Sequence, residues 1–469
     1  MTDDELAYAT TAELAGLMRR RALSPVELMR ATLARIEKLE PKLNAFATLT
    51  GEKALAAAKE AEGAFLKAET PPPLTGIPIT IKDLAITKGI KTERGSKTQR
   101  GMVPKEDAPC VSRLAAAGAI VLGKTTTSEF GWKGVSQSPL TGITHNPWRE
   151  GFNAGASSAG AAVAAAAGYG PLHQGSDGAG SIRMPAHFCG VFGLKPTYGR
   201  VPNYPVSTGD YTAHIGPITR TVADAALMLA AMAGPHPLDH SSAEAWPEPY
   251  AARLGEGIRG ARIAFSPDLG HARVDKDVAA LVAAAAKVFS AELGASVEEV
   301  TPSWGRLGPD LIRLFWPAHM TSYARHLPKF ESEMDPGLVA CIRHGEAVSM
   351  AGYQEARERK YAYCAEVGRF FEDWDFLLTP AVSVAAFPAE RLMPADWPEH
   401  PWDWLSWAEF SYPFNFTGNP AASIPCGFTA NGLPVGLQVV GRRFDDSGVL
   451  RAAAAFEAAW PWAGKRPPL

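Results

Sequence analysis

Three separated segments of the chain offer side chains that could carry out acyl transfer. A glycine- and alanine-rich run holds Ser157 and Ser158, a second run holds Ser181, and a strand-like segment ends with Lys82. A serine hydroxyl can attack a carbonyl carbon, and a neutral lysine can take up the proton that the hydroxyl loses. The residues therefore predict a serine hydrolase with a lysine base. The three segments read Gly155-Ala156-Ser157-Ser158-Ala159-Gly160, Gly175-Ser176-Asp177-Gly178-Ala179-Gly180-Ser181-Ile182-Arg183 and Gly76-Ile77-Pro78-Ile79-Thr80-Ile81-Lys82-Asp83.

The lysine can act as a base only where its amine is neutral. An ordinary lysine has a pKa of about 10.4, so that removing its proton at pH 7 would cost about 4.6 kcal/mol. Burial disfavours the charged amine and lowers this pKa. A lysine is usually a solvated surface charge, but Lys82 follows an apolar and β-branched run, Ile77 to Ile81. We therefore expect Lys82 to be buried at a strand end and to serve as the general base.

Small residues before Ser181 favour an oxyanion hole. Gly178, Ala179 and Gly180 have little or no side chain. Consecutive backbone N–H groups can therefore turn toward one point, together with the N–H of Ser181. Such donors stabilise the oxyanion that forms when a hydroxyl attacks an amide carbonyl.

Other polar side chains near these segments have supporting or structural interpretations. Asp177 and Arg183 lie on either side of Ser181, and we expect them to form an ion pair that holds the loop without taking part in the chemistry. Serines in glycine- and alanine-rich runs often cap helices, and only the joint pattern with Lys82 and Ser181 favours catalysis over that interpretation of Ser157. A lysine mechanism leaves no necessary role for the nearby histidines, His173, His187 and His214.

Two nucleotide-binding patterns occur in the chain and are set aside. Gly118–Thr125 matches the P-loop pattern, but a P-loop follows its strand, whereas the Ala-Ile-Val-Leu portion here is itself the strand candidate. Gly255–Gly260 matches the dinucleotide fingerprint but precedes a strand instead of following one. The GxSxG nucleophile motif is absent, and no serine lies three residues before a lysine. We expect no cofactor.

The remaining pattern alternates between helices and short strands. Ser24 and Glu27 form a capping box with Pro25 at the first helical position, and Thr10 and Glu13 repeat the box for an earlier helix. Such alternation predicts an α/β fold with helices on both faces of a mainly parallel or mixed sheet. The expected strands are 77–81, 119–122, 262–265, 376–378, 421–424 and 436–440, and two further expected helices are 278–293 and 447–458.

Composition limits the class of partner and compartment. The chain has 469 residues, a formal net charge of −3 and scattered Lys and Arg residues. This pattern offers no basic face for nucleic acid. No apolar run reaches the roughly 18 residues that a membrane span needs, and the N-terminus lacks the basic and apolar regions of a signal peptide. Five cysteines without CxxC spacing indicate neither a disulfide framework nor a zinc site. We expect a cytoplasmic protein without a metal, acting on a small molecule.

The chain resembles the amidase signature family. The resemblance includes the glycine- and serine-rich block together with its upstream strand, and it extends over nearly the whole chain. The block departs from the usual family pattern at several glycine positions, but all three candidate catalytic residues are present. Further matching segments are Gly190-Val191-Phe192-Gly193-Leu194-Lys195-Pro196-Thr197, Gly216-Pro217-Ile218-Thr219-Arg220-Thr221-Val222-Ala223-Asp224, Asn419-Pro420-Ala421-Ala422 and Gly432-Leu433-Pro434-Val435-Gly436-Leu437-Gln438.

This resemblance implies a role for each candidate residue. Ser181 aligns with the nucleophile, Ser157 with the serine that follows a cis peptide bond and relays the proton, and Lys82 with the general base. Ser158 is expected to support the site together with Asp177 and Arg183. The implied fold is a central mixed sheet of about eleven strands covered on both faces by helices.

We also predict that residues 1–469 form a single domain, because no stretch has the length or composition of an interdomain linker. Within it, residues 1–65 would form a helical segment packed on the rest, 76–200 the signature core, and 255–469 the remainder of the sheet and pocket.

The predicted function is hydrolysis of C–N bonds in small amides through an acyl-enzyme intermediate. Carbamates (urethanes) and esters are further candidate substrates, and we expect a monomer or a homodimer. Aryl or hydrophobic amides are favoured if the aromatic residues of 397–416 line the pocket; packing in the core is an equally good interpretation of them. Other segments expected to contact substrate are 132–138, 202–213 and 314–323.

Two alternatives to this function remain. The first is the glutaminase subunit of a tRNA-dependent amidotransferase, which also resembles this family but works in a complex. Against it, the segment 204–215 does not look like the corresponding segment of that glutaminase, and nothing in the sequence indicates a partner surface. The second is a catalytically idle binding protein on the same scaffold, which the complete triad disfavours.

Overall fold

The computed structural model of the chain describes residues 1–67, 71–244 and 248–469. The strands of its central sheet are β1 (Phe46–Leu49), β2 (Pro78–Lys82), β3 (Ile120–Thr125), β8 (Leu172–Asp177), β9 (Phe192–Lys195), β10 (His214–Thr219), β11 (Arg262–Phe265), β12 (Ser296–Glu299), β13 (Phe376–Pro380), β14 (Ala421–Phe428) and β15 (Pro434–Gly441). Two small hairpins are formed by β4 (Gln137–Ser138) with β5 (Gly142–Ile143) and by β6 (His145–Asn146) with β7 (Arg149–Asn153).

The central sheet is mixed. Its 11 strands lie in the order β1-β3-β2-β8-β10-β9-β14-β15-β13-β11-β12. β2 runs parallel to β3 and β8, and β11 runs parallel to β12 and β13. The other neighbouring pairs are antiparallel. The predicted α/β fold with a mixed sheet of about eleven strands is confirmed.

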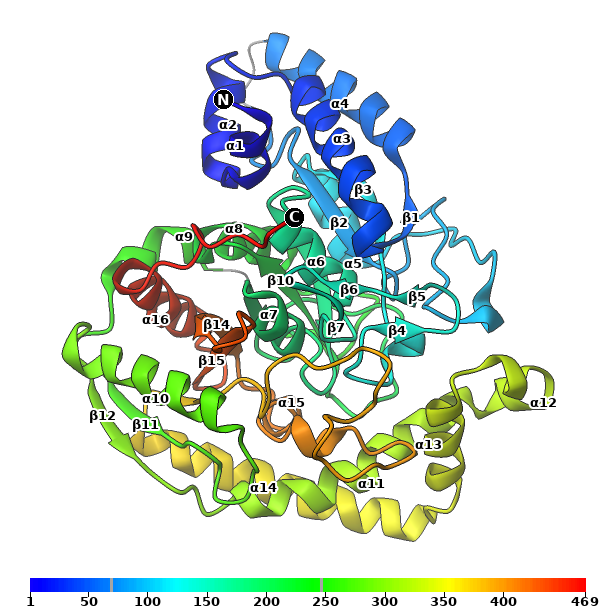
Figure 1. Ribbon diagram of the computed structural model, residues 1–469, viewed down its shortest axis with the longest axis vertical. Helices are drawn as coiled ribbons and strands as arrows, with labels where there is room; N and C mark the ends of the chain where they lie inside the picture. The colour runs from blue at the N-terminus through cyan, green and yellow to red at the C-terminus, as the bar shows by residue number, and fades with distance from the viewer. Residues whose placement is uncertain (68–70, 245–247) are drawn as a thin grey trace.

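Helices cover the sheet, as Figure 1 shows. The α-helices are α1 (Asp3–Tyr8), α2 (Thr11–Arg19), α3 (Pro25–Leu43), α4 (Gly51–Leu66), α5 (Pro109–Ala116), α6 (Ala159–Ala167), α7 (Arg183–Cys189), α8 (Val222–Met232), α9 (Tyr250–Arg253), α10 (Lys276–Ala291), α11 (Gly308–Met320), α12 (Leu327–Phe330), α13 (Pro336–Glu346), α14 (Met350–Asp373), α15 (Pro413–Phe416) and α16 (Asp446–Ala459). Short 3₁₀ turns are η1 (Lys97–Gln99), η2 (Glu129–Gly131), η3 (Leu254–Glu256), η4 (Gly305–Leu307), η5 (Thr321–His326), η6 (Glu331–Glu333) and η7 (Leu405–Trp407).

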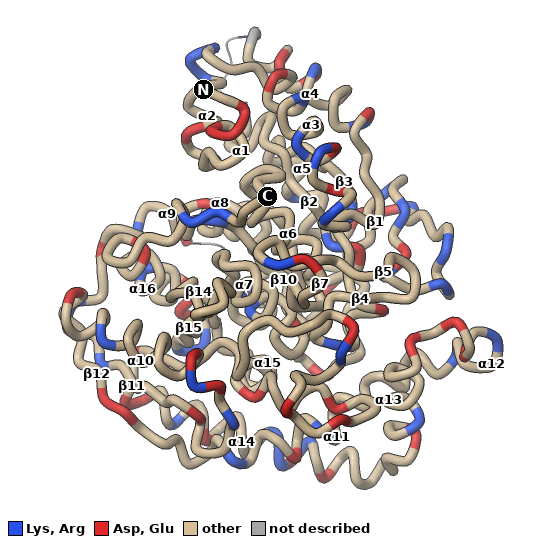
Figure 2. The backbone as a smooth tube through the Cα atoms, in the orientation of Figure 1, with Lys and Arg blue, Asp and Glu red and all other residues tan. Residues whose placement is uncertain are grey.

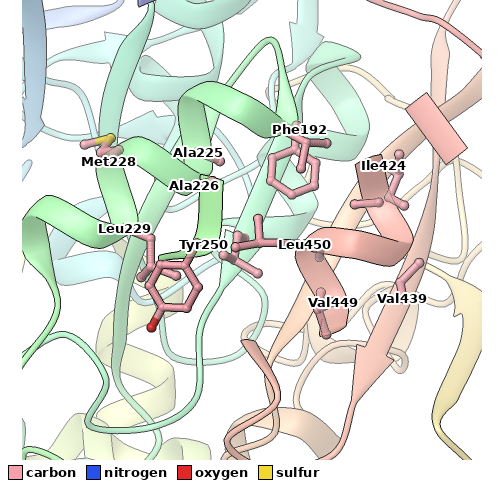
Figure 3. Close-up of a cluster of buried hydrophobic side chains, with 14 of the residues drawn as sticks. Phe192, Ala225, Ala226, Met228, Leu229, Tyr250, Ile424, Val439, Val449 and Leu450 are labelled. Carbon is pink, nitrogen blue, oxygen red and sulfur yellow. The ribbon is translucent and has the colours of Figure 1, made fainter. Parts of the chain in front are cut away.

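Successive side chains of a strand point to opposite sides of the sheet, and the inner strands bury both faces, whereas the edge strands β1 and β12 are partly exposed. On β13, Phe376 and Leu378 belong to one buried cluster and Leu377 belongs to another. Figure 3 shows part of the first cluster, in which α8 and α16 pack against the sheet through Leu229 and Leu450. The second cluster is rich in aromatic residues and lies among α11, α13, α14 and the 382–416 segment. These two packed layers hold the strand ends rigidly.

The predicted helix starts agree with the structure. The capping boxes of Ser24 with Glu27 and of Thr10 with Glu13 are both formed, at the starts of α3 and α2. The P-loop match 118–125 forms a turn and β3, and its Lys124 is buried, with Nζ 2.6 Å from the carbonyl of Ala85. These eight residues therefore do not have the strand–loop–helix arrangement that binds phosphate.

Figure 2 shows Lys and Arg residues interspersed with Asp and Glu residues along the backbone. None of the helices in the described part of the chain is long and apolar enough to cross a membrane.

Candidate active site

The topology brings the predicted catalytic segments to one edge of the sheet. β2 and β8 are parallel neighbours, with Ile81 opposite Gln174, so their carboxyl ends meet at the same edge. Lys82 is the last residue of β2, and Asp177 is the last of β8. Ser157 lies in the turn that leads into α6, which packs against both strands. Segments far apart in the sequence therefore meet where loops leave the sheet.

Lys82 lies at the centre of a cluster of hydroxyl groups. Its Nζ is 2.7 Å from Oγ of Ser157, 2.9 Å from Oγ of Ser158 and 2.9 Å from Oγ of Ser176. The same Nζ is 3.2 Å from the carbonyl oxygen of Ser176. The side chain of Lys82 is fully buried. The structure thus places the predicted lysine and Ser157 in direct hydrogen-bond contact.

The hydrogen bonds of this cluster restrict which hydroxyl donates to a neutral Lys82. A neutral amine has two N–H donors and one lone pair. Ser158 Oγ donates to the carbonyl of Ser176 at 3.1 Å, and that carbonyl can only accept. The lone pair of Nζ is therefore left to accept from the hydroxyl of Ser157 or of Ser176. The contacts around Nζ are therefore compatible with a hydrogen bond from the Ser157 hydroxyl to this lone pair.

Burial favours the neutral form of Lys82. Removal from water lowers the pKa of Lys82 well below its usual value, and the negative charge of Asp177 opposes this shift only in part. A lowered pKa favours the neutral amine, which is the form that can act as a base.

The turn around Ser157 is tied to the loop that carries Ser181. The peptide bond between Ala156 and Ser157 is cis, as the resemblance implies. The backbone N–H of Ser158 donates to the carbonyl of Ser181 at 3.2 Å. Ser181 is 4 % exposed and Ser157 is 2 % exposed, so both hydroxyls lie in a sheltered site.

The carboxylate of Asp177 organises the loop before Ser181. It accepts hydrogen bonds from the N–H of Gly180 at 2.7 Å and of Ile182 at 3.2 Å. The Gly180 N–H is thus already donated to a protein group, which departs from the expected oxyanion hole. The amides of Gly178, Ala179 and Ser181 have no backbone or side-chain acceptor among the described residues. Three of the four predicted oxyanion donors are therefore not committed to a protein acceptor.

Arg183 neutralises the buried carboxylate. Its guanidinium donates to both oxygens of Asp177, at 2.9 and 3.0 Å, and both side chains are fully buried. Burial alone would raise the pKa of Asp177, but Arg183 outweighs it and holds the pKa well below the usual range. Asp177 and Arg183 therefore form the ion pair predicted from the sequence.

Removing one member of this pair should destabilise the protein strongly. Arg183→Met leaves Asp177 charged and buried without its partner, and such losses cost about 3–5 kcal/mol of unfolding free energy. Urea denaturation at pH 7 measures the change. The double variant Asp177→Asn with Arg183→Met, which removes both charges, is expected to recover part of the loss. A single Arg183→Met variant as stable as the wild type would contradict this account.

Two glycines of the nucleophile loop offer a matched comparison. Gly180 has φ +116°, and a Cβ there would lie 2.5 Å from Oγ of Ser411. A Cβ on Gly178 would have only Cζ3 of Trp316 near it, at 4.0 Å. We expect Gly180→Ala to lower the thermal midpoint by several degrees, since strain at such a φ costs about 1–3 kcal/mol. Gly178→Ala should keep the wild-type midpoint but lose activity, because its methyl group enters the open space at the loop that precedes Ser181.

Six aromatic residues of the 397–416 stretch belong to the core. Their exposed fractions lie between 0 and 6 %, and they pack in the second buried cluster. Of the two interpretations of this stretch, the burial of these side chains favours core packing. The six side chains are Trp402, Trp404, Trp407, Phe410, Tyr412 and Phe414.

Three polar residues near the site were not selected from the sequence. Ser176 contacts Lys82. It lies on β8 two residues after Gln174, which pairs with Ile81 of β2. This position beside the end of β2 could have suggested the contact. Ser411 donates to the carbonyl of Ala179 at 2.6 Å, and Asn415 donates to Asp177 at 2.9 Å. Both lie more than 200 residues from their partners, and no local pattern marks them.

No group of three or more His, Cys, Asp and Glu side chains in residues 1–67, 71–244 and 248–469 is placed to hold a metal ion. His173 and His187, which lie near the motifs in sequence, are buried, and burial lowers the pKa of His173 to about 3 and of His187 to about 4. The neutral form of both imidazoles is therefore favoured.

Comparisons with known proteins agree on one family. The profile of the Amidase family matches residues 27–450. An acylamidase of Rhodococcus erythropolis is 39 % identical, over 100 % of this chain and 98 % of the relative. A glutamyl-tRNA(Gln) amidotransferase subunit of Geobacter sp. (strain M21) is 34 % identical, over 99 % of this chain and 100 % of the relative. The crystal structure of a bacterial aryl acylamidase superimposes with a TM-score of 0.91 at 27 % identity, covering 98 % of this chain and 99 % of that one.

Proposed function

This chain belongs to the amidase signature family and is an amidase, and we propose that it is a standalone hydrolase of small, uncharged aryl or hydrophobic amides. Ser181 is the nucleophile, Ser157 the proton relay and Lys82 the general base. The observation that carries the proposal is the buried Lys82 amine, 2.7 Å from Oγ of Ser157 and with a lowered pKa.

The reaction begins with attack by Oγ of Ser181 on the amide carbonyl carbon. The hydroxyl proton of Ser181 passes to Ser157 as Ser157 gives its own proton to Lys82. The oxyanion accepts hydrogen bonds from the uncommitted amides of Gly178, Ala179 and Ser181. Ser157 then protonates the leaving amine as Lys82 returns its proton to Ser157, the C–N bond breaks, and an ester on Ser181 remains. A water molecule then attacks the ester carbonyl by the same sequence of proton transfers, and the acid is released. The same route applies to carbamates and esters.

The electrostatics of the site support an uncharged substrate. Asp177 and Arg183 are fully buried and paired with each other, and Lys82 is favoured in its neutral form. These groups therefore have no net charge to offer an ionic substrate. The names of two relatives, an acylamidase and an aryl acylamidase, support an amide with an acyl or aryl group.

The cellular compartment and the oligomeric state of the enzyme are part of the same proposal. The five cysteines are free in the structure, and four of them are buried, which suits the reducing cytoplasm. We place the protein there as a single-domain monomer or homodimer that binds no nucleic acid.

A second candidate is the glutaminase subunit of an amidotransferase, because a relative that belongs to such an enzyme matches 99 % of this chain. Glutamine carries a carboxylate and an ammonium group, which a site must neutralise. A panel of 4-nitroanilides, aliphatic amides, glutamine, 4-nitrophenyl esters and aryl carbamates distinguishes the two candidates. Turnover of anilides by the purified chain alone supports the amidase. Turnover of glutamine alone, or no turnover without a partner, would replace it by the glutaminase.

A further inference from the structure

An open space lies beside the nucleophile loop at Gly178. Gly178 is half-buried, and a Cβ placed on it would meet a single atom within 4 Å, Cζ3 of Trp316 at 4.0 Å. Gly180, on the other side of Ala179, is by contrast packed against Ser411 and Met184. The loop is thus closed by protein on one side and open on the other, and the open side is bordered by an indole ring.

The indole ring that borders this space is fixed. Trp316 lies on α11, is 6 % exposed, and its Nε1 donates to the carbonyl of Trp132 at 3.0 Å. Nε1 of Trp404 donates to the same carbonyl at 2.9 Å. The two indoles pack edge to face, with centroids 5.6 Å apart and planes at 82°. A ring held by a hydrogen bond and by a second ring cannot easily swing aside.

The surroundings on the Ser157 side are also apolar. A Cβ on Gly131 would lie 3.0 Å from Oγ of Ser157 and 3.1 Å from Cδ1 of Leu84. The preceding residue, Phe130, stacks on Tyr323 with centroids 4.2 Å apart. The elements that carry Trp316 and Tyr323, α11 and η5, are continuous in the chain. One helical segment therefore supplies the ring beside Gly178 and the ring that stacks on Phe130, the neighbour of Gly131.

We propose that Trp316 is a specificity-determining residue, whose indole limits the size of the substrate group that lies over Gly178 to a short or flat apolar one. This inference rests on the proposed amidase function and adds the residue that sets its substrate range. Removing part of the indole enlarges the space without touching Lys82, Ser157 or Ser181. In a hydrophobic pocket a single methylene changes kcat/KM by roughly 10–200-fold.

The test compares two substrate series on purified variants. One series lengthens the acyl group of 4-nitroanilides from acetyl to hexanoyl, and the other lengthens the amine of N-alkyl acetamides. We expect Trp316→Ala to raise the ratio of kcat/KM for the long over the short member at least about tenfold in one series. The series that responds identifies the group over Gly178. Trp316→Phe, which keeps a ring, should change the same ratio in the same direction by a smaller factor.

The matched control is Trp462→Phe. It removes the same kind of hydrogen bond, from the indole to the backbone carbonyl of Arg220, at a ring that is 5 % exposed and lies in the other buried cluster, and both ratios should stay at their wild-type values. An active wild type with unchanged ratios in Trp316→Ala and Trp316→Phe would overturn this inference alone. A wild type inactive on both series would overturn the proposed function as well. If Trp316→Ala fails to fold, Trp316→Phe against Trp462→Phe decides the question.

Discussion

Ser181→Ala is expected to lower kcat for amides on the order of 10⁶-fold, the scale seen when a serine hydrolase loses its nucleophile. The hydroxyl of Ser181 forms the only covalent bond to the acyl group in the proposed reaction, and no other group in that reaction can replace it. Substrate binding should be nearly unchanged, because alanine removes one oxygen atom.

Two measurements check this prediction. Steady-state hydrolysis of a 4-nitroanilide gives the loss in kcat, and mass spectrometry after a serine-directed fluorophosphonate shows whether the covalent adduct disappears. Ser290→Ala is the matched control, since Ser290 lies on the exposed side of α10, where its hydroxyl donates to the carbonyl of Lys287. That variant should keep its adduct and its rate. Persistence of the adduct in Ser181→Ala would show that another serine is the nucleophile.

The strand that positions the base could be predicted because its pattern is local. Ile77 to Ile81 read as a strand, and the structure has β2 at Pro78–Lys82. A continuous β-branched run is typical of a strand buried on both faces, and a lysine directly after it has to share that burial. The fully buried Lys82 follows from sequence and physics alone.

The partners that organise the nucleophile loop could not be predicted in this way. Ser411 and Asn415 reach the loop from residues more than 200 positions away, and neither belongs to a periodic pattern. Composition also cannot distinguish a ring in the core from a ring at a pocket, because aromatic residues serve both purposes. Trp404 and Trp316 illustrate this: the former is fully buried, and the latter borders open space. The direction in which each backbone N–H points also depends on the three-dimensional structure. The N–H of Gly180, for example, donates to the carboxylate of Asp177.

Lys82→Met is expected to lower kcat about 10²–10⁴-fold, the usual contribution of a general base, and to change how stability depends on pH. The lowered pKa of Lys82 means that the unfolded chain binds a proton that the folded chain does not. Between the folded-state pKa and about 10.4, the free energy of unfolding therefore rises with pH, and the contribution of Lys82 is least favourable at low pH. Methionine has no proton to bind, so the variant should show a flatter dependence. Urea denaturation between pH 6 and 10 measures the slope.

Lys195→Met separates the loss of catalysis from this change in stability. Lys195 is also fully buried with a lowered pKa caused mainly by burial, but its Nζ donates to the carbonyls of Asn419 and Pro196 and to no serine. We expect Lys195→Met to flatten the pH dependence of stability as Lys82→Met does, while keeping most of the activity. Equal losses of activity in both variants would show that buried lysines act here through the fold. A loss confined to Lys82→Met would mean that its amine takes the proton, because the shared burial is then excluded as the cause.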